Sequence, residues 1–302
     1  MAIEIPTSMP RSTAESVLAG IVMMACAAAL FSVMNALVKL LSAEYSTVQI
    51  IWARTLSHLI FVLLLFAPRR RFRLLRSEQL SDQIARSFLL LFSTCCFFTG
   101  VKFVPLAQAA SITFAAPFFV VALAAMVLGE RPGPASWIAI AVGFLGVLII
   151  IRPGAGVYHW ASLLFLASAF FYAIYQLLTR RVARFDAPET SVVYSALVGT
   201  LVMSLLVPFF WTSPPALASG ALLFGLGIFG GLGHYCVARA LDFAPASIVS
   251  PFHYLQLIGA TAMGFIMFAE VPDLWTIAGA AVIIASGLSI LWDESKGARR
   301  PR

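Results

Sequence analysis

The sequence predicts an all-α integral membrane protein of ten transmembrane helices, built as two inverted five-helix repeats. Three observations predict this fold: an apolar composition, long stretches without charge, and a weak internal repeat. Of the 302 residues, 61% are hydrophobic and 11% are charged, and the mean hydropathy is +0.95. Soluble domains carry about 25% charged residues. The surface of this chain is therefore expected to face lipid.

The stretches without charge locate the individual helices. A helix needs roughly 20 apolar residues to cross the bilayer core, and the charged residues of this chain cluster between such stretches. The third stretch is the shortest, because only residues 87–101 separate Arg86 from Lys102. The predicted spans are 17–40, 47–67, 86–104, 106–129, 134–151, 159–180, 190–211, 216–240, 245–268 and 273–292.

The two halves of the chain match at an offset of 140 residues. Pro105 pairs with Pro245 and Glu130 with Glu270, at equivalent places relative to the spans. Because each half holds five spans, the second half must enter the membrane upside down. Inverted repeats recur in secondary transporters, whose substrate site lies near the midplane. The predicted organisation is a tail at 1–16, repeats at 17–151 and 159–292, and a basic tail at 293–302.

The positive charges predict the orientation. If the N-terminus is cytoplasmic, most Lys and Arg residues fall in cytoplasmic segments, while Lys39, Lys102 and Arg152 lie at outer ends. Cytoplasmic loops carry such an excess. We therefore expect a multi-pass protein of the inner (plasma) membrane with both termini cytoplasmic. The positive residues behind the net charge of +7 are then expected to contact lipid headgroups, and no nucleic-acid partner is expected.

Glycines in span eight raise a different possibility, because Gly225, Gly227 and Gly230 have the G-x-G-x-x-G spacing of dinucleotide-binding loops. That motif requires a preceding strand and a βαβ unit, whereas here the glycines lie inside an apolar span. Gly227 and Gly231 are four residues apart and share a helix face, which is typical of close helix packing in membranes. We expect them to have a structural or gating role, with Gly225 and Gly233 extending the same surface.

Polar and aromatic side chains within the spans are candidates for a substrate site. Each also has a structural interpretation: membrane tyrosines can lie at the interface, and a histidine can bond a neighbouring helix. The candidates for substrate binding are Asn35, Tyr172, Tyr175, Gln176, His234, His253, Tyr254 and Gln256.

A second group of polar residues has a predicted structural or gating role. Lys39 shares a helix face with Asn35. Arg54 and His58 share a face of span two and need partners, since charge inside a membrane is costly. Arg239 follows the span-eight glycines.

The sequence lacks the residues that proton coupling, sodium binding, ATP binding or hydrolysis would require. All 13 acidic residues lie in predicted loops or at span ends, so no buried carboxylate is expected to relay protons or bind sodium. The sequence has no phosphate-binding loop and no H-E-x-x-H motif. Its four cysteines lie within spans and suggest neither a disulfide framework nor a metal site. We therefore expect no enzyme activity, cofactor or metal, and facilitated diffusion or exchange rather than tight proton coupling.

Seven segments carry a resemblance to a known family. They are FSVMNALVKLL, WARTL, VKFVPLAQAASI, LGERP, FFYAIYQLLTRR, ARALDFAPASIVSP and FAEVPDLWTIAGAAVIIASGLSIL. Together they resemble the drug/metabolite transporter superfamily, in its ten-helix EamA-type branch, over about residues 17–292. The resemblance implies a central cavity between the halves, alternating access and small organic substrates. Many members have Trp-Gly where this chain has Phe31-Ser32, and the resemblance fixes no substrate.

The sequence thus predicts a secondary carrier of amino acids or similar metabolites, an exporter or facilitator that is a monomer or homodimer. The alternatives among carriers are an exporter of drugs or hydrophobic cations and an uptake system for metabolites like S-adenosylmethionine. A lipid scramblase or an intramembrane enzyme would belong to different classes. The enzyme lacks a recognisable nucleophile, base or metal cluster, and the scramblase requires a polar groove open to lipid.

Overall fold

The computed structural model describes residues 14–70, 74–127, 133–152, 159–244 and 246–298. Within these ranges the chain is helical and forms no strand. Eight helical segments are long and apolar enough to cross a membrane, and two shorter apolar helices, Phe252–Phe268 and Leu274–Ser289, complete the ten-helix fold. Outward-facing residues such as Leu64 and Leu205, each 74% exposed, are apolar. This exposed surface suits lipid.

The first repeat runs from α1 to α6. Its helices are α1 (Ala14–Leu41), α2 (Thr47–Arg70), α3 (Leu80–Gly100), α4 (Leu106–Thr113), α5 (Ala116–Val127) and α6 (Pro134–Ile151). The second repeat consists of α7 (Ala161–Val182), α8 (Pro188–Leu206), η2 (Val207–Phe210), α9 (Leu217–Phe243), α10 (Ala246–Val249), η3 (Ser250–Tyr254), α11 (Leu255–Phe268) and α12 (Leu274–Ala298). The segments α4–α5 and α10–η3–α11 each form one interrupted span.

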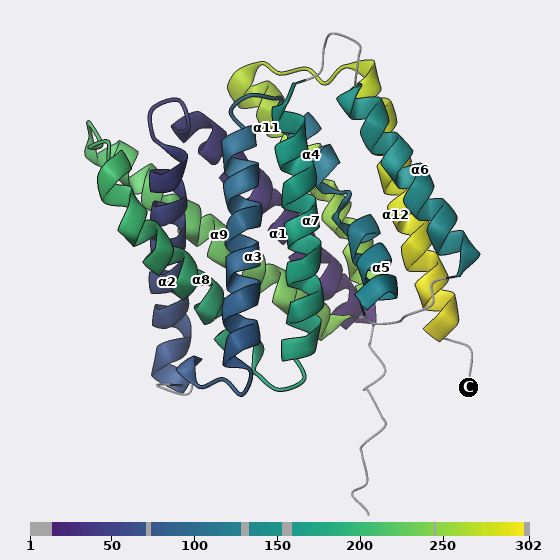
Figure 1. Ribbon diagram of the computed structural model, residues 1–302, viewed down its shortest axis with the longest axis horizontal. Coiled ribbons are helices and arrows are strands. Elements are labelled where there is room, and N and C mark those ends of the chain that lie inside the picture. Colours follow the sequence, from purple (N-terminus) through teal and green to yellow (C-terminus); the bar gives the residue numbers. More distant parts are fainter. Residues whose placement is uncertain (1–13, 71–73, 128–132, 153–158, 245, 299–302) are drawn as a thin grey trace, which may run out of the picture.

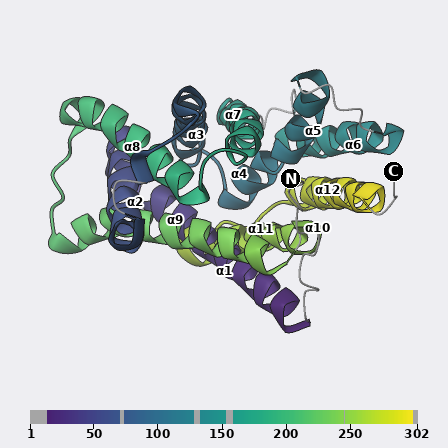
Figure 2. The ribbon, with the colours of Figure 1, turned by 90° about the horizontal axis from the view of Figure 1, so that it is seen from below.

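The repeats are interleaved in two layers (Figure 2). One layer holds α3, α5 and α6 of the first repeat together with α7 of the second, and the other holds α9, α11 and α12 together with α1. The packing follows the same symmetry: α1 packs along α9 as α7 packs along α3, while α2 meets α8 and α6 meets α12. The first helix of each repeat therefore packs in the layer formed mainly by the other repeat. In Figure 1, α1 begins and α12 ends at the lower end of the bundle.

Glycine permits the closest of these contacts. At the crossing of α6 and α12, a Cβ on Gly146 would lie 3.0 Å from the carbonyl oxygen of Gly279, and a Cβ on Gly279 would lie 2.6 Å from that of Gly146. Such small-residue contacts let membrane helices approach backbone to backbone.

The third helix differs from its predicted bounds. It covers Leu80–Gly100 rather than 86–104, so Arg86 lies inside it and Lys102 follows it in a turn. Arg86, placed in a cytoplasmic segment by the sequence, is in fact only 1% exposed. The helix extends past this charge because polar groups of neighbouring helices surround it, which a count of charges along the sequence does not detect.

Candidate functional site

The two interrupted spans meet at the centre of the bundle. In the first repeat the helix stops at Thr113 and restarts at Ala116, because Pro117 has no N–H to donate to the preceding turn. In the second repeat the span is interrupted by η3, which has proline in its first turn and ends at Tyr254, the position equivalent to Phe114. Phe114 and Tyr254, which correspond at the 140-residue offset, stack with ring centroids 4.9 Å apart. The break thus brings equivalent residues of the two repeats together, as broken helices do at transporter sites.

A series of six aromatic side chains crosses the bundle at this point, and we call it the ring row. Successive ring centroids lie 5.8, 5.1, 6.3, 5.7 and 4.9 Å apart. These separations fall in the range of favourable aromatic pairs. The members of the ring row are, in order, His58, His234, Phe31, His253, Phe114 and Tyr254.

The ring row unites some of the predicted residues and adds others. His234, His253 and Tyr254 were predicted to bind substrate, and His58 to have a structural role. Phe31 and Phe114 were not predicted, although the repeat offset already paired Phe114 with Tyr254. The hydroxyl of Tyr254 points at α12, where a Cβ on Gly287 would collide with it. The Tyr254 ring is therefore held between Phe114 and α12.

Arg54 lies beside the start of the ring row. It is 8% exposed, and its Nε atom has no hydrogen-bond partner among the described residues. The same holds for Nε2 of His58, one helical turn later and 7% exposed. The guanidinium lies over the ring of Phe98, 5.6 Å from its centroid. Within the described structure, both side chains have unused polar atoms at the centre of the bundle.

Arg86 connects the predicted tyrosines of α7 to α3. Its Nη2 donates to the Tyr175 hydroxyl (3.0 Å), its Nε to Thr179 (3.0 Å), and its Nη1 to Gln83 (2.9 Å) and the Ser191 carbonyl (2.8 Å). Tyr172 stacks on Tyr175, with centroids 5.5 Å apart. Tyr175 therefore packs against a cation within the bundle, and Tyr172 packs on Tyr175.

A hydrogen-bond network extends from Arg86 to the lower end of the bundle. Gln83 donates to Asp186 (2.9 Å), which also accepts from Ser77 and from the backbone N–H of Glu78 (2.9 Å). Burial by itself would raise the pKa of Asp186. The hydrogen bonds to its carboxylate lower the pKa by more than burial raises it, so the pKa lies below its ordinary value. Asp186 lies in the loop between α7 and α8, as predicted for the acidic residues, but it is buried there, at 7% exposed.

At the upper end of the bundle, Lys39 joins three segments. It pairs with Glu270, in the turn between α11 and α12, and donates to the carbonyl of Val104 (2.7 Å). Glu270 also accepts from the backbone N–H of Leu106 (2.9 Å). We call this group the upper clasp, because it ties α1 to the α3–α4 turn and to the second repeat.

The remaining predicted residues lie around this centre. Ser32 of α1 donates to the backbone carbonyl of Gln256 (3.3 Å). Asn35 is buried on α1, on the face that carries Ser32 and Lys39. Gln176 is half-buried on α7, and the Arg239 guanidinium lies 4.6 Å from the centroid of the Phe243 ring, outside the ring row.

The span-eight glycines face different neighbours. A Cβ on Gly227 would meet the backbone of α2, including the Arg54 carbonyl at 2.6 Å, and one on Gly231 would meet Phe61 at 2.7 Å. The expectation that Gly225 and Gly233 extend this surface is wrong. Gly225 has nothing within 4 Å, and Gly233 packs against α1 instead of α2.

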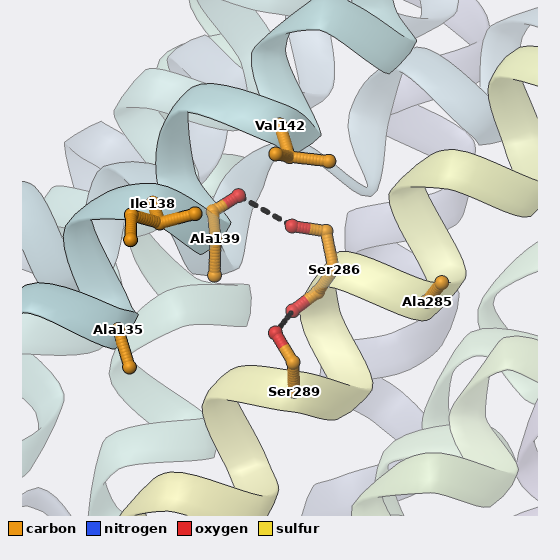
Figure 3. Close-up of a pocket in the computed structure, with 7 residues that line it drawn as sticks. All are labelled: Ala135, Ile138, Ala139, Val142, Ala285, Ser286 and Ser289. Carbon is orange, nitrogen blue, oxygen red and sulfur yellow. Dashed lines mark hydrogen bonds between the residues drawn. The ribbon is translucent and has the colours of Figure 1, made fainter.

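A groove of about 400 Å³ lies elsewhere, between α6 and α12 (Figure 3). Its hydroxyls are already bonded: Ser286 donates to the carbonyl of Ala139, and Ser289 to that of Ser286 (2.7 Å). The groove faces outward and offers a metabolite little polar recognition. Its lining residues are Ala135, Ile138, Ala139, Val142, Ala285, Ser286 and Ser289.

The interleaved inverted repeats and the interrupted spans that meet at the centre define the class of secondary transporters. Comparison with known proteins identifies the particular family. Residues 18–152 and again 159–292 match the EamA-like transporter family, and the chain belongs to that family. The inverted five-helix repeats predicted from the sequence are confirmed.

Three relatives illustrate the range of the family. A riboflavin transporter of Vibrio cholerae is 33% identical over 231 residues, which cover 76% of this chain and 77% of the relative. A pseudopaline exporter of Pseudomonas aeruginosa is 30% identical, covering 90% and 95%. An S-adenosylmethionine uptake transporter of Rickettsia conorii is 28% identical, covering 72% and 74%. Their shared function supports the assignment of this chain as a membrane transporter of small metabolites.

The fold also matches a solved crystal structure with a TM-score of 0.63 and 18% sequence identity. The match covers 95% of this chain and 99% of the other. At this identity the match bears on the fold alone.

Proposed function

We propose that the chain is a facilitative carrier of small metabolites that bear a planar ring, with aromatic amino acids as the first class to test. The observation that carries this proposal is the ring row at the meeting point of the interrupted spans. Aromatic side chains at these separations offer faces and edges on which a flat solute can stack. The histidines of the row and the adjacent Arg54 add hydrogen-bond donors for the polar end of an amino acid.

Riboflavin is a second candidate solute. It is a flat tricycle without net charge, and two relatives at 33% and 30% identity are riboflavin transporters. The row formed by His234, Phe31, His253 and Phe114 is long enough to offer more than one ring contact. A metabolite like S-adenosylmethionine fits less well, because its sulfonium would find no acidic side chain in the ring row.

Alternating access would exchange the solute between the two ends of the bundle. The upper clasp must open for the solute to leave at the upper end. The ring row contains no acidic side chain, so we infer that the gradient of the solute drives net movement in either direction. We further propose that the lower end, where α1 begins and α12 ends, faces the cytoplasm across the inner membrane.

The test is uptake of labelled tryptophan, tyrosine, phenylalanine and riboflavin into proteoliposomes, with a gradient of the solute alone. The wild type should show saturable uptake. His253→Ala should weaken uptake because it opens the middle of the ring row. His159→Ala is the matched control, since His159 stacks on Phe103 outside the row, with centroids 5.5 Å apart, and should leave uptake unchanged. Absence of uptake of every solute, with and without an imposed pH gradient, would overturn the proposal.

A further inference from the structure

Arg54 has a positive charge that the described protein does not neutralise. The ion pairs among the described residues involve Lys39, Arg152 and Arg181, not Arg54. A buried charge in a membrane protein is costly and is normally paired or hydrogen-bonded. Its Nε is fully enclosed, and the one ring below the guanidinium belongs to Phe98. The protein thus maintains a strong, directional donor without an acceptor.

A glycine lies against this guanidinium. A Cβ built on Gly230 of α9 would lie 3.6 Å from Nε and 3.7 Å from Nη2 of Arg54. The same Cβ would lie 3.2 Å from the sulfur of Met34. A Cβ at this position would thus be in ordinary van der Waals contact with the guanidinium and tight against the Met34 sulfur. Gly230 therefore lets α9 lie against Arg54 without a side chain between them.

The charges around Arg54 favour a negatively charged group on a bound solute. His58 and His234 interact electrostatically with Arg54, and Arg86 lies within electrostatic range of His234. Arg86 already uses four of its five N–H donors in hydrogen bonds within the protein. Its charge adds to the local positive potential, but its guanidinium is held by those bonds. Among the described arginines near the ring row, Arg54 is therefore the one for which no hydrogen bond within the protein is found at Nε.

We propose that Arg54 binds the carboxylate of the transported solute, so that the site selects organic anions and zwitterions over neutral or cationic analogues of the same shape. This inference rests on the proposed carrier function and deepens it by naming the substrate class. A carboxylate that reaches the guanidinium beside Gly230 would accept charge-assisted hydrogen bonds from it. The ring of the same solute would then lie on the His58–His234–Phe31 end of the ring row.

Two pairs of probes test this selectivity. Indole-3-acetate and indole-3-acetamide share ring and size but differ in charge, as do tryptophan and tryptophanamide at the carboxyl end. Binding is measured by thermal shift of the purified full-length protein in detergent, and transport in proteoliposomes, at one fixed pH. The wild type should bind each acid at least about tenfold more tightly than its amide, the worth of one charge-assisted hydrogen bond.

Variants separate a binding role from a structural one. Arg54→Gln should abolish the preference for the acid, whereas Arg54→Lys should retain part of it. Because Arg54→Gln removes an unpaired buried charge, its unfolding temperature without solute should be no lower than that of the wild type. Gly230→Ala should weaken binding of the acids while keeping the charge, and Gly225→Ala, with nothing within 4 Å, should not.

The outcomes distinguish this inference from the carrier proposal. If the wild type transports panel solutes but binds neither acid better than its amide, the inference fails and the carrier function stands. A preference that survives Arg54→Gln, or a lowered unfolding temperature of that variant, likewise overturns it. If no panel solute is transported, the carrier proposal fails and this inference fails with it.

Discussion

Two buried arginines near the centre of the bundle have opposite surroundings. Arg86 on α3 donates four hydrogen bonds to α3, α7 and α8. Arg54 on α2 is similarly buried, yet its Nε is unpartnered within the described structure and a glycine, Gly230, lies against it. An arginine that uses most of its donors within the protein holds helices together, whereas one with unused donors is available to a ligand. The number of partners, rather than burial, separates the two roles.

The strongest test of this comparison is the loss of Arg86. Arg86→Gln should lower the free energy of unfolding by about 3 kcal/mol or more, because it leaves buried acceptors on three helices unsatisfied. Unfolding temperatures in detergent, compared with those of Arg54→Gln, measure the difference. Arg86→Lys should rescue little, since an ammonium cannot reach all four acceptors. Equal unfolding temperatures for Arg86→Gln and Arg54→Gln would remove the distinction.

The contact of α9 with α2 behind Arg54 gives the next largest effect. Gly227→Ala should destabilise the protein by about 1–3 kcal/mol, since the new Cβ would press on the α2 backbone. Gly225→Ala, two residues away in the same helix, is the control and should be neutral or slightly stabilising. Thermal unfolding of both variants measures this contrast. A neutral Gly227→Ala would show that α2 and α9 can move apart at this point.

Asp186 extends the Arg86 network and should respond to pH. Asp186→Asn should cost about 1–2 kcal/mol near neutral pH, because an amide cannot accept the same charge-assisted hydrogen bonds. The pKa of Asp186 is depressed in the folded protein, so its stabilisation is present above the ordinary pKa of 3.8 and is lost as pH falls through the folded value. The unfolding temperatures of wild type and variant should therefore converge in acid. A constant difference would contradict this assignment.

The smallest expected effect on stability concerns the upper clasp. Lys39 and Glu270 have side chains 11% and 18% exposed, and pairs that reach solvent contribute about 1 kcal/mol or less. A double-mutant cycle with Lys39→Met and Glu270→Gln measures the coupling. In proteoliposomes the same variants should alter turnover more than apparent affinity, because the clasp lies away from the ring row. An affinity change without a turnover change would place Glu270 in the binding site instead.

The fold was largely predictable from the sequence because its signals are local. Apolar length gave the spans, and an odd number of spans per repeat gave the inversion. The bounds of α3 were not predictable in this way, since Arg86 is tolerated only through partners on α7 and α8. The interruptions of spans four and nine did have a local signal, in Pro117 and Pro251, that an analysis of hydropathy alone passes over.

The candidate site was predictable only in part. Histidines and tyrosines stand out in apolar helices, so His234, His253 and Tyr254 could be singled out. Phe31 and Phe114 could not, because phenylalanine is common in this chain and only tertiary structure aligns these rings. The different environments of Gly225 and Gly233 likewise depend on which helix is adjacent. The partners of a residue decide its role, and the sequence does not show them.

The stacked pair of Phe114 and Tyr254 bears on how such a protein diversifies. Side chains at equivalent positions meet each other only along the axis that relates the two copies, so a change there in one copy is felt directly by the other. In this chain the second copy carries histidine and tyrosine where the first carries Thr113 and Phe114. The two repeats therefore present different side chains at equivalent positions. Under the proposed function, a solute bound beside this pair would meet different chemistry on its two sides, which would favour one orientation.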